Sequence, residues 1–247
     1  MSDHIAYSDK LFADYQQKVQ KFQFDDKVAR VFPDMIKRSV PGYENIITLI
    51  GLFAQAHATS NTNCYDLGCS LGASTMAILE NLGNTNCRVI GVDNSEAMGS
   101  QCAKNLREIY PTEKYQIICD DIENISLNNA SVVVLNFTLQ FIPKSRRDKL
   151  IKHIYQAIVP GGVLILSEKI CFSNALKNHL FTELHYGFKK TQGYSDLEIS
   201  QKRSALENTL IPESSESHLN RLKLAGFSDA DLCFQCLNFA SFFAIKS

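Results

Sequence analysis

The sequence lacks the features that would place the chain in a membrane, on a nucleic acid or around a nucleoside triphosphate. No apolar run in its 247 residues is long enough to span a bilayer, and the residues after Met1 do not form a signal peptide. A formal net charge of −1 gives no global field to attract nucleic acid. The motif G-x-x-x-x-G-K-[ST] is absent, which excludes a P-loop. We therefore expect a cytoplasmic protein with no membrane partner and no direct nucleic-acid partner.

The spacing of metal ligands is absent as well. Eight cysteines are scattered through expected strands and helices, and the only C-x-x-C, Cys233 to Cys236, falls in an expected strand. Residues three apart on a strand point to opposite faces, so these thiols should share neither a metal nor a disulfide. The six histidines show no zinc spacing with them. We expect reduced thiols and no bound metal.

One stretch, Asn63 to Ala77, predicts the end of a strand, a glycine turn and then a helix. Gly68 and Gly72 bracket the turn, where glycine permits positive φ and lets a ligand approach the main chain. Asp66 precedes the turn, at the carboxyl end of the expected strand, where open α/β sheets bind ligands. The stretch does not match the dinucleotide fingerprint G-x-G-x-x-G, and a glycine turn alone is common in α/β proteins.

The following strands end in polar residues at the same expected edge. Arg88–Asp93 is apolar and ends in an acid roughly 20 residues past the turn, where a doubly wound site places the carboxylate that binds ribose. Asp121 follows the third strand, and Asn136 ends the fourth. Strand and helix alternate over residues 60–170, which predicts a parallel sheet with helices on both faces.

Helices should cover this core at its N-terminal side. Residues 1–60 read as helical, with one segment, Phe24–Val40, interrupted at Pro33 and a second, strongly apolar segment at Tyr43–His57. Tyr43 could reach the site or could be a packing anchor, and the sequence favours neither.

A second helical region interrupts the alternation after the fifth strand. Residues 171–218 should form a lid of two helices, Phe172–Lys190 and Leu197–Asn208, with a capping box at Ser195 and Glu198. We interpret the charged residues of this region as a solvated face: His185, Lys189, Lys190, Lys202 and Arg203. The whole chain is then expected to be one domain, with a cover at 1–60, a nucleotide-binding core at 61–170, the lid at 171–218 and the last strands at 219–247.

Three motifs together resemble the class I S-adenosylmethionine-dependent methyltransferases: Asp66–Gly72, Gly91–Ser95 and Ile118–Ile122. The resemblance implies a Rossmann-like fold whose seven-stranded, mostly parallel sheet carries helices on both faces. It also implies that Asp93 binds the ribose and that Asp121 binds the adenine amine. Adding Tyr43, the expected cofactor-binding residues are Tyr43, Gly68, Cys69, Ser70, Asp93, Asn94, Asp121, Ile122 and Asn136. The commonest form of the motif has a third glycine where this chain has Ser70.

A narrower resemblance covers nearly the whole chain. Gly193–Asn208, Cys233–Phe239 and Phe24–Tyr43 are similar to the carboxy-S-adenosyl-L-methionine synthase family. This implies a homodimeric enzyme that uses prephenate to carboxylate the methyl carbon of S-adenosyl-L-methionine, releasing phenylpyruvate. The product, carboxy-S-adenosyl-L-methionine, would pass to a separate enzyme that modifies the wobble uridine of tRNA. The resemblance also implies that Arg203 recognises the added carboxylate, since arginine's planar fork binds carboxylates bidentately.

Two other functions fit the same motifs. An ordinary small-molecule methyltransferase would release S-adenosylhomocysteine and would not need prephenate. A non-catalytic protein that binds S-adenosylmethionine would keep Asp66, Asp93 and Asp121 beside an unreactive lid.

Overall fold

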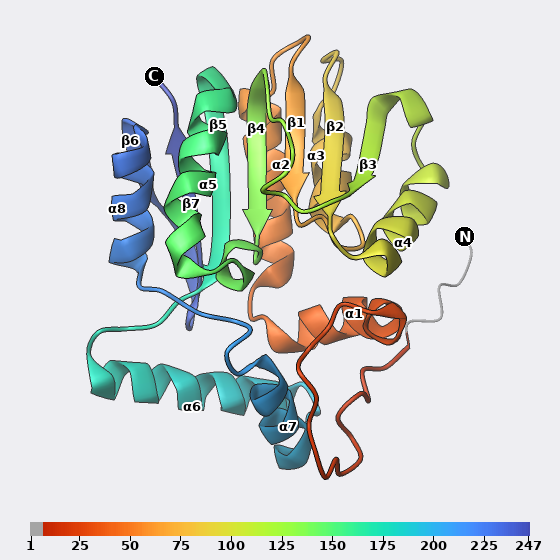
Figure 1. The fold of residues 1–247 in the computed structure, drawn as a ribbon, viewed down its shortest axis with the longest axis vertical. Helices are drawn as coiled ribbons and strands as arrows, with labels where there is room; N and C mark the ends of the chain where they lie inside the picture. The colour runs from red at the N-terminus through yellow and green to blue at the C-terminus, as the bar shows by residue number, and fades with distance from the viewer. Residues whose placement is uncertain (1–6) are drawn as a thin grey trace.

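A computed structural model describes residues 7–247 as one seven-stranded sheet with helices packed around it (Figure 1). The strand order is β3-β2-β1-β4-β5-β7-β6, in which β7 pairs antiparallel with both of its neighbours and the other pairs are parallel. The strands are β1 Asn63–Leu67, β2 Arg88–Asp93, β3 Tyr115–Cys119, β4 Ala130–Asn136, β5 Ile158–Lys169, β6 Asp229–Cys236 and β7 Phe239–Ile245. The expected Rossmann-like, mostly parallel sheet is confirmed.

Helices cover both faces of this sheet. The apolar sides of α2, α3 and α4 pack on one face, and those of α5 and α8 pack on the other. The helices are α1 Asp26–Ser39, α2 Tyr43–His57, α3 Ala73–Asn81, α4 Glu96–Arg107, α5 Lys144–Ala157, α6 Ala175–Thr191, α7 Asp196–Leu206 and α8 Ser215–Ala225, with short 3₁₀ turns η1 Thr112–Lys114 and η2 Leu139–Phe141. Every residue of β4 up to Leu135 is buried, which its run of valines requires because both faces are covered.

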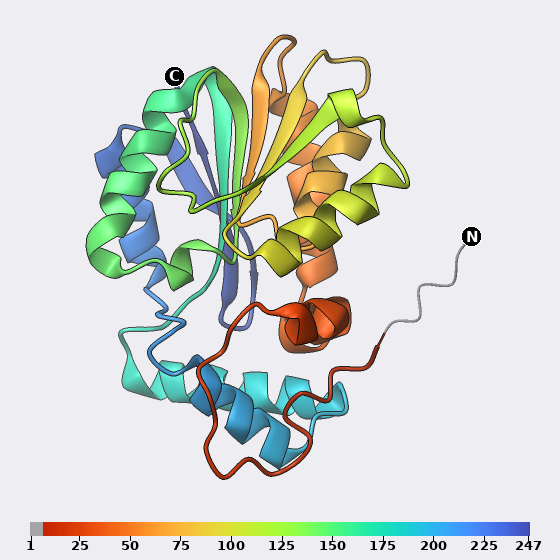
Figure 2. The same cartoon turned by 45° about the vertical axis from the view of Figure 1, so that its right-hand side comes forward.

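The remaining helices lie beyond the carboxyl edge of the sheet. The arrowheads of β1, β2 and β4 point toward a layer made of α1, α6 and α7 (Figure 1). The segment before α1 runs alongside α7 (Figure 2), where the side-chain amide of Gln201 donates to the carbonyls of Phe12 and Asp14, both at 2.9 Å. This layer faces the edge at which the predicted site residues end.

Local sequence explains most of the helix boundaries. Asp25 caps α1 and Ser95 caps α4 with side-chain oxygens that accept backbone N–H groups. Ser195 and Glu198 form the capping box predicted for α7. Gly42 takes φ 78° just before α2, so the chain turns sharply between the first two helices.

Four expectations about secondary structure are wrong. Residues 7–25 are not helical, because they lack an apolar face and are held by polar contacts to α7 instead; residues 1–6 lie outside the described part of the chain. Pro33 lies inside α1 without ending it, since burial of flanking apolar side chains offsets the lost hydrogen bond. Residues 160–162, whose Pro-Gly-Gly sequence predicts a turn, lie within β5. The region 219–247, expected to hold the last strands, begins inside a helix that was not expected, α8.

Candidate functional site

The carboxyl ends of β1, β2 and β4 meet at one cavity of about 590 Å³. The chain passes from β1 to β2 on one side and to β4 on the other, so this is the point of the sheet where the strand order reverses and where open α/β sheets bind ligands. Nine of the ten predicted site residues line the cavity, namely Tyr43, Gly68, Cys69, Ser70, Asp93, Asn94, Asp121, Ile122 and Asn136. The tenth, Arg203, is not among its lining residues.

Asp93 is fixed at the end of β2 by the main chain. Its Oδ2 accepts from the amide of Ser70 at 2.8 Å, and its Oδ1 accepts from the amide of Ser95 at 2.9 Å. Burial raises the pKa of Asp93, while these two amides oppose that shift. Each oxygen keeps a further lone pair, so a rigidly held carboxylate can accept hydroxyl groups such as those of a ribose.

The glycine turn packs closely against the end of β2 and against Thr138. The amides of Gly68 and Cys69 both donate to the carbonyl of Val92, at 2.8 and 2.9 Å, so the turn lies over the end of β2. Gly68 has φ 86°, and a Cβ there would meet the Oγ1 of Thr138 at 2.3 Å. Ser70 takes φ 50° although it is not glycine, a strained conformation that positions its amide to donate to Asp93.

Two buried polar atoms beside the turn have no partner within the described protein. They are Oδ1 of Asp66 and Oδ1 of Asn136. The other oxygen of Asp66 accepts from the hydroxyl of Thr75 at 2.6 Å, and the Nδ2 of Asn136 donates to the hydroxyl of Ser74 at 3.0 Å. Burial raises the pKa of Asp66 to about 7. Of these two residues only Asn136 lines the cavity, so its oxygen is the acceptor that lies next to a bound ligand, whereas Asp66 is fully buried behind the turn.

The end of the cavity next to Asp121 and Ile122 suits a flat nucleobase. Ile122 is 5% exposed and supplies an apolar wall. The Oδ1 of Asp121 accepts from the amide of Glu123 at 2.9 Å, which orients its carboxylate. An oriented carboxylate beside an apolar wall fits an exocyclic amine on a flat ring.

The opposite end of the cavity is basic, which the sequence analysis did not predict. Lys169 at the end of β5, His185 and Lys189 on α6, and Lys202 on α7 all line it. His185, Lys189 and Lys202 are 3%, 7% and 6% exposed. The expectation that these three form a solvated face is therefore wrong, although it holds for Lys190, which is 53% exposed in its side chain. The four-residue spacing of His185 and Lys189 places them on one helix face, but only the fold turns that face inward.

A network of polar contacts holds α6 and α7 against the N-terminal segment. Lys202 Nζ forms a buried ion pair with Asp9 at 3.4 Å and donates to the hydroxyl of Ser39 at 3.0 Å. The hydroxyl of Tyr194 donates to the same carboxylate at 2.6 Å. The guanidinium of Arg38 lies 3.9 Å from the centre of the Tyr194 ring. These contacts hold α7 and the end of α6 beside the cavity.

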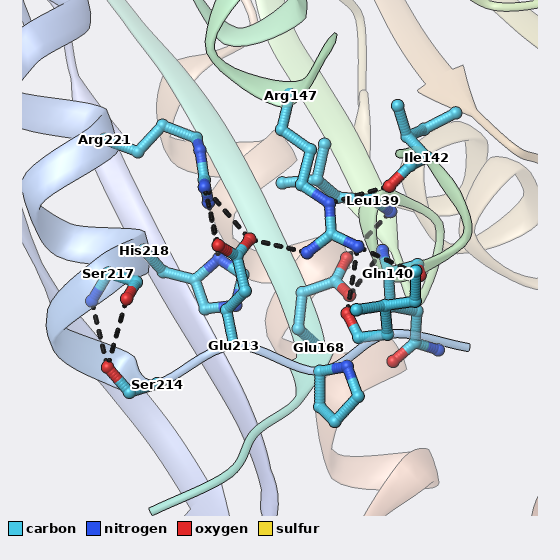
Figure 3. A network of polar contacts seen from close by, with 12 residues as sticks. Leu139, Gln140, Ile142, Arg147, Glu168, Glu213, Ser214, Ser217, His218 and Arg221 are labelled. Carbon is cyan, nitrogen blue, oxygen red and sulfur yellow. Dashed lines mark hydrogen bonds and ion pairs between the residues drawn. The ribbon is translucent and has the colours of Figure 1, made fainter. Parts of the chain in front are cut away.

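A second network anchors the loop that follows β4 (Figure 3). The fully buried Arg147 pairs with Glu213 at 2.5 Å and donates to the carbonyls of Gln140 and Ile142 at 3.1 and 2.8 Å. Glu168 accepts from the amides of Leu139 and Gln140, both at 2.9 Å. Because this loop also lines the cavity, the network fixes one wall of the site.

Arg203 does not line the cavity, although its charge, after burial, helps to lower the pKa of Lys169 at the basic end. It is exposed on α7, with its guanidinium 5.9 Å from the centre of the Tyr186 ring. Its role as the carboxylate-binding residue stays a prediction.

Among residues 7–247, no three His, Cys, Asp or Glu side chains converge to hold a metal ion. No helix within that range combines the length and the apolar character needed to cross a bilayer.

Comparison of the sequence with known families and proteins finds full-length relatives. A family model described as Methyltransferase domain matches residues 65–162. Carboxy-S-adenosyl-L-methionine synthase of Pseudoalteromonas atlantica is 52% identical, covering 94% of this chain and 95% of its own. The protein of that name in Geobacter sp. strain M21 is 52% identical, over 97% of this chain and 98% of its own. The carboxy-S-adenosyl-L-methionine synthase of Actinobacillus pleuropneumoniae serotype 5b is 50% identical to this chain. The match covers 96% of this chain and 99% of that protein.

Comparison with solved structures supports the fold. A putative S-adenosyl-L-methionine-dependent methyltransferase from Methanococcus maripaludis superimposes with a TM-score of 0.62 at 19% identity, covering 94% of this chain and 98% of that one. Magnesium protoporphyrin IX methyltransferase from Synechocystis PCC 6803, solved with bound SAH, gives a TM-score of 0.60 at 15% identity, covering 86% and 87%. At these identities the likeness extends to the fold alone.

Proposed function

We infer the function from one premise: this chain belongs to the carboxy-S-adenosyl-L-methionine synthase family. It is an enzyme of that family, and we propose that it converts S-adenosyl-L-methionine to carboxy-S-adenosyl-L-methionine. The observation that carries this function is an identity of 50% to 52% with three such synthases over 94% to 97% of the chain. The cavity supports it, because its acidic end suits a nucleoside and its basic end suits a carboxylate.

We propose prephenate as the source of the carboxyl group. Loss of carbon dioxide and hydroxide from prephenate leaves phenylpyruvate. The hydroxide takes a proton from the methyl group of the sulfonium, forming water and an ylide. The ylide carbon then attacks the carbon dioxide, which forms the new carbon–carbon bond and completes the balance of atoms and charge. Water would quench the ylide, so this sequence requires the closed lid that Lys202 and Asp9 hold.

The product serves tRNA modification under this proposal. A separate enzyme would transfer its carboxymethyl group to the wobble uridine, and the chain itself would not touch nucleic acid. The net charge of −1 agrees with a chain that does not bind tRNA itself. The reaction would take place in the cytoplasm, where tRNA is modified.

We also propose that the chain works as a homodimer and that Arg203 binds the added carboxylate. A stripe of leucines on α6, Leu176, Leu180 and Leu184, is 82%, 54% and 46% exposed, which is an apolar face that a second copy could cover. Arg203 lies outside the cavity of its own chain, so either lid movement or a second copy must bring it to the ligand.

Two variants test these points. Leu180→Glu should give a monomer by sedimentation, whereas Leu224→Glu, at a residue 75% exposed on α8, should not. Arg203→Ala should abolish the carboxylated product while S-adenosylmethionine still binds. Activity in a mixture of inactive Arg203→Ala and inactive Asp93→Ala proteins would show that one copy serves the cavity of the other. Full activity of Arg203→Ala alone would refute its role.

Mass spectrometry tests the function as a whole. The small molecule released from freshly purified, denatured protein should be one carbon dioxide heavier than S-adenosylmethionine. Purified protein given S-adenosylmethionine and prephenate should yield that species and phenylpyruvate. Turnover of S-adenosylmethionine to S-adenosylhomocysteine with a methyl acceptor, without any need for prephenate, would instead identify an ordinary small-molecule methyltransferase. Binding without turnover under either condition would identify a non-catalytic protein.

A further inference from the structure

We propose that Lys169 and Lys189, with Lys202 behind them, form the subsite that binds the two carboxylates of the dianionic substrate. This inference rests on the proposed function for the identity of the dianion, prephenate. It assigns a place to each half of the reaction: the nucleoside at the acidic end of the cavity and the dicarboxylate at the basic end.

The three lysines come from three separate elements but converge on one cavity. Lys169 is the last residue of β5, Lys189 lies in the last turn of α6, and Lys202 lies on α7. Lys189 and Lys202 are 7% and 6% exposed, so each ammonium group has little access to solvent outside the cavity. Such convergence is not needed to hold the helices together, since apolar residues would do so at a lower desolvation penalty.

The charge of this cluster is only partly balanced. Lys202 pairs with Asp9 at 3.4 Å. For Lys169 and Lys189, no ion pair and no side-chain hydrogen bond from the ammonium group is found among residues 7–247. Burial, and after it the positive charges of Lys202 and Lys169, lower the pKa of Lys189 to about 7. Buried like charges without counterions are unfavourable, and an incoming dianion would remove that penalty.

The carboxylates of the nucleoside end are too far away to balance these charges. Asp93 ends β2, while Lys169 ends β5, and two strands, β1 and β4, lie between them. Three strand spacings amount to roughly 14 Å. The glycine turn and Asn136 lie between the two ends, where the methionine part and its sulfonium methyl group would lie. A dicarboxylate held by the lysines would therefore lie next to the methyl group that is to be carboxylated.

The charge of the ligand changes during the proposed reaction in a way that suits this subsite. Prephenate carries two carboxylates, but phenylpyruvate keeps one, because the other leaves as carbon dioxide. A subsite with two unpaired cations should bind the dianion more tightly than the monoanion. The same lysines would then favour substrate over product and assist release of phenylpyruvate.

The test uses lysine-to-methionine variants, which keep the apolar stem and remove the charge. Lys169→Met and Lys189→Met should each raise the KM for prephenate by about 10- to 100-fold, the range for loss of one hydrogen bond to a charged group. The affinity for S-adenosylmethionine, measured by calorimetry without prephenate, should change less than about threefold. Inhibition by phenylpyruvate should weaken less than prephenate binding does.

Lys190→Met is the matched control, because Lys190 is the next residue of α6 and its ammonium pairs with Asp196 at 2.6 Å on the surface. It should leave the KM for prephenate unchanged. Lys189→Arg should recover part of the lost affinity if charge is what matters, which separates binding from a merely structural effect on the lid.

Two results would overturn the proposal. One is a KM for prephenate in both methionine variants within about twofold of the unchanged protein. The other is an equal loss of affinity for S-adenosylmethionine and prephenate, which would point to general damage to the lid. Failure of the proposed function would look different, because the unchanged protein would then make no carboxylated product from prephenate.

Discussion

The two ends of the cavity collect opposite charges and hold them by different means. At the acidic end, Asp93 and Asp121 stand at or next to the ends of strands and are held by main-chain amides: Asp93 by those of Ser70, in the turn after β1, and Ser95, and Asp121 by that of Glu123. At the basic end, Lys189 and Lys202 are carried by two lid helices and are positioned by contacts between segments far apart in sequence. The first arrangement is built into the sheet, and the second depends on how α6 and α7 pack across the edge of the sheet. The following predictions test that contrast, starting with the largest expected effect.

Removing the buried ion pair of the lid should have the largest effect on stability. Lys202→Met leaves Asp9, which is 2% exposed, as a buried carboxylate without its cation, a change that costs about 3–5 kcal/mol in such pairs. Urea denaturation would measure the global part of this loss, and faster hydrogen exchange in residues 7–25 would measure local opening of the lid. Lys190→Met breaks an exposed pair on the same lid and should change the free energy of unfolding by less than about 1 kcal/mol. Equal losses of unfolding free energy in Lys202→Met and Lys190→Met would show that the buried ion pair matters no more than the exposed one.

Removing the carboxylate of the acidic end should mainly affect binding. Asp93→Ala deletes the acceptor expected for the ribose and leaves the amides of Ser70 and Ser95 without their partner. We expect the Kd for S-adenosylmethionine, measured by calorimetry, to rise by roughly 10- to 100-fold. Asp231→Ala, on the exposed part of β6, is the control and should leave this Kd unchanged. An unchanged Kd for Asp93→Ala would mean that the ribose contact is misplaced.

The glycine turn should tolerate no side chain. Gly68→Ala combines φ 86° with a Cβ that would lie 2.3 Å from Thr138, whereas Gly161→Ala has φ 79° and nothing within 4 Å. Positive φ alone costs about 1–2 kcal/mol for alanine, so both variants should lose that much stability. Only Gly68→Ala should lose more and should also weaken binding of S-adenosylmethionine. Thermal denaturation with and without S-adenosylmethionine would separate the two effects.

The basic end should respond to pH, and the acidic end should respond less. The pKa of Lys189 is lowered to about 7 and that of Lys202 to about 8, mainly by burial. The other groups facing them are Lys169, Asp9, Tyr194, Arg38 and His185, whose pKa is lowered to about 3 so that it stays neutral. A dianion needs protonated lysines, so the KM for prephenate should be lowest below pH 7 and rise by at most about tenfold per pH unit above it.

Stability of the ligand-free protein should follow pH in the opposite direction. Each lysine has a lowered pKa in the folded state, so the unfolded chain binds more protons between about pH 7 and the ordinary lysine value of 10.5. The free energy of unfolding should therefore rise as the pH increases through that range. Urea denaturation at several pH values would detect this trend, and Lys189→Met should reduce it. A KM for prephenate that falls with rising pH while the free energy of unfolding increases would contradict the charges assigned to these lysines.

Local sequence patterns were enough to predict the residues that form the acidic end of the cavity. Alternation of strand and helix predicted the sheet, and the bounds predicted for Tyr43–His57 and Arg88–Asp93 agree with the structure. Each of these elements has a continuous apolar pattern and a clear break after it. Asp93 and Asp121 lie next to strand ends, so predicting the strands also placed the carboxylates at one edge of the sheet.

Charged residues whose burial depends on distant segments were not predicted. Arg147 lies in a run of basic residues that reads as a solvated helix start, yet its side chain is fully buried against Glu213, 66 positions away in sequence. Ile109 continues the helical spacing of Cys102 and Leu106, which predicts a buried position, but it lies beyond the end of α4 and is 62% exposed. No local pattern reveals a partner that far along the chain, and hydropathy assigns such residues to the wrong surface.

The sequence by itself determined the parallel part of the sheet, the alternation of its strands and helices, and the carboxylates at its edge, because backbone hydrogen bonding and apolar periodicity act over short stretches. The tertiary structure alone decided which charges of the lid point inward. Lys189 and Lys190 are neighbours of the same type, yet one is buried at the cavity and the other pairs with Asp196 in solvent. The difference arises because α6 packs across the carboxyl edge with one face, and burial, unlike helix formation, depends on what lies on the other side of that face.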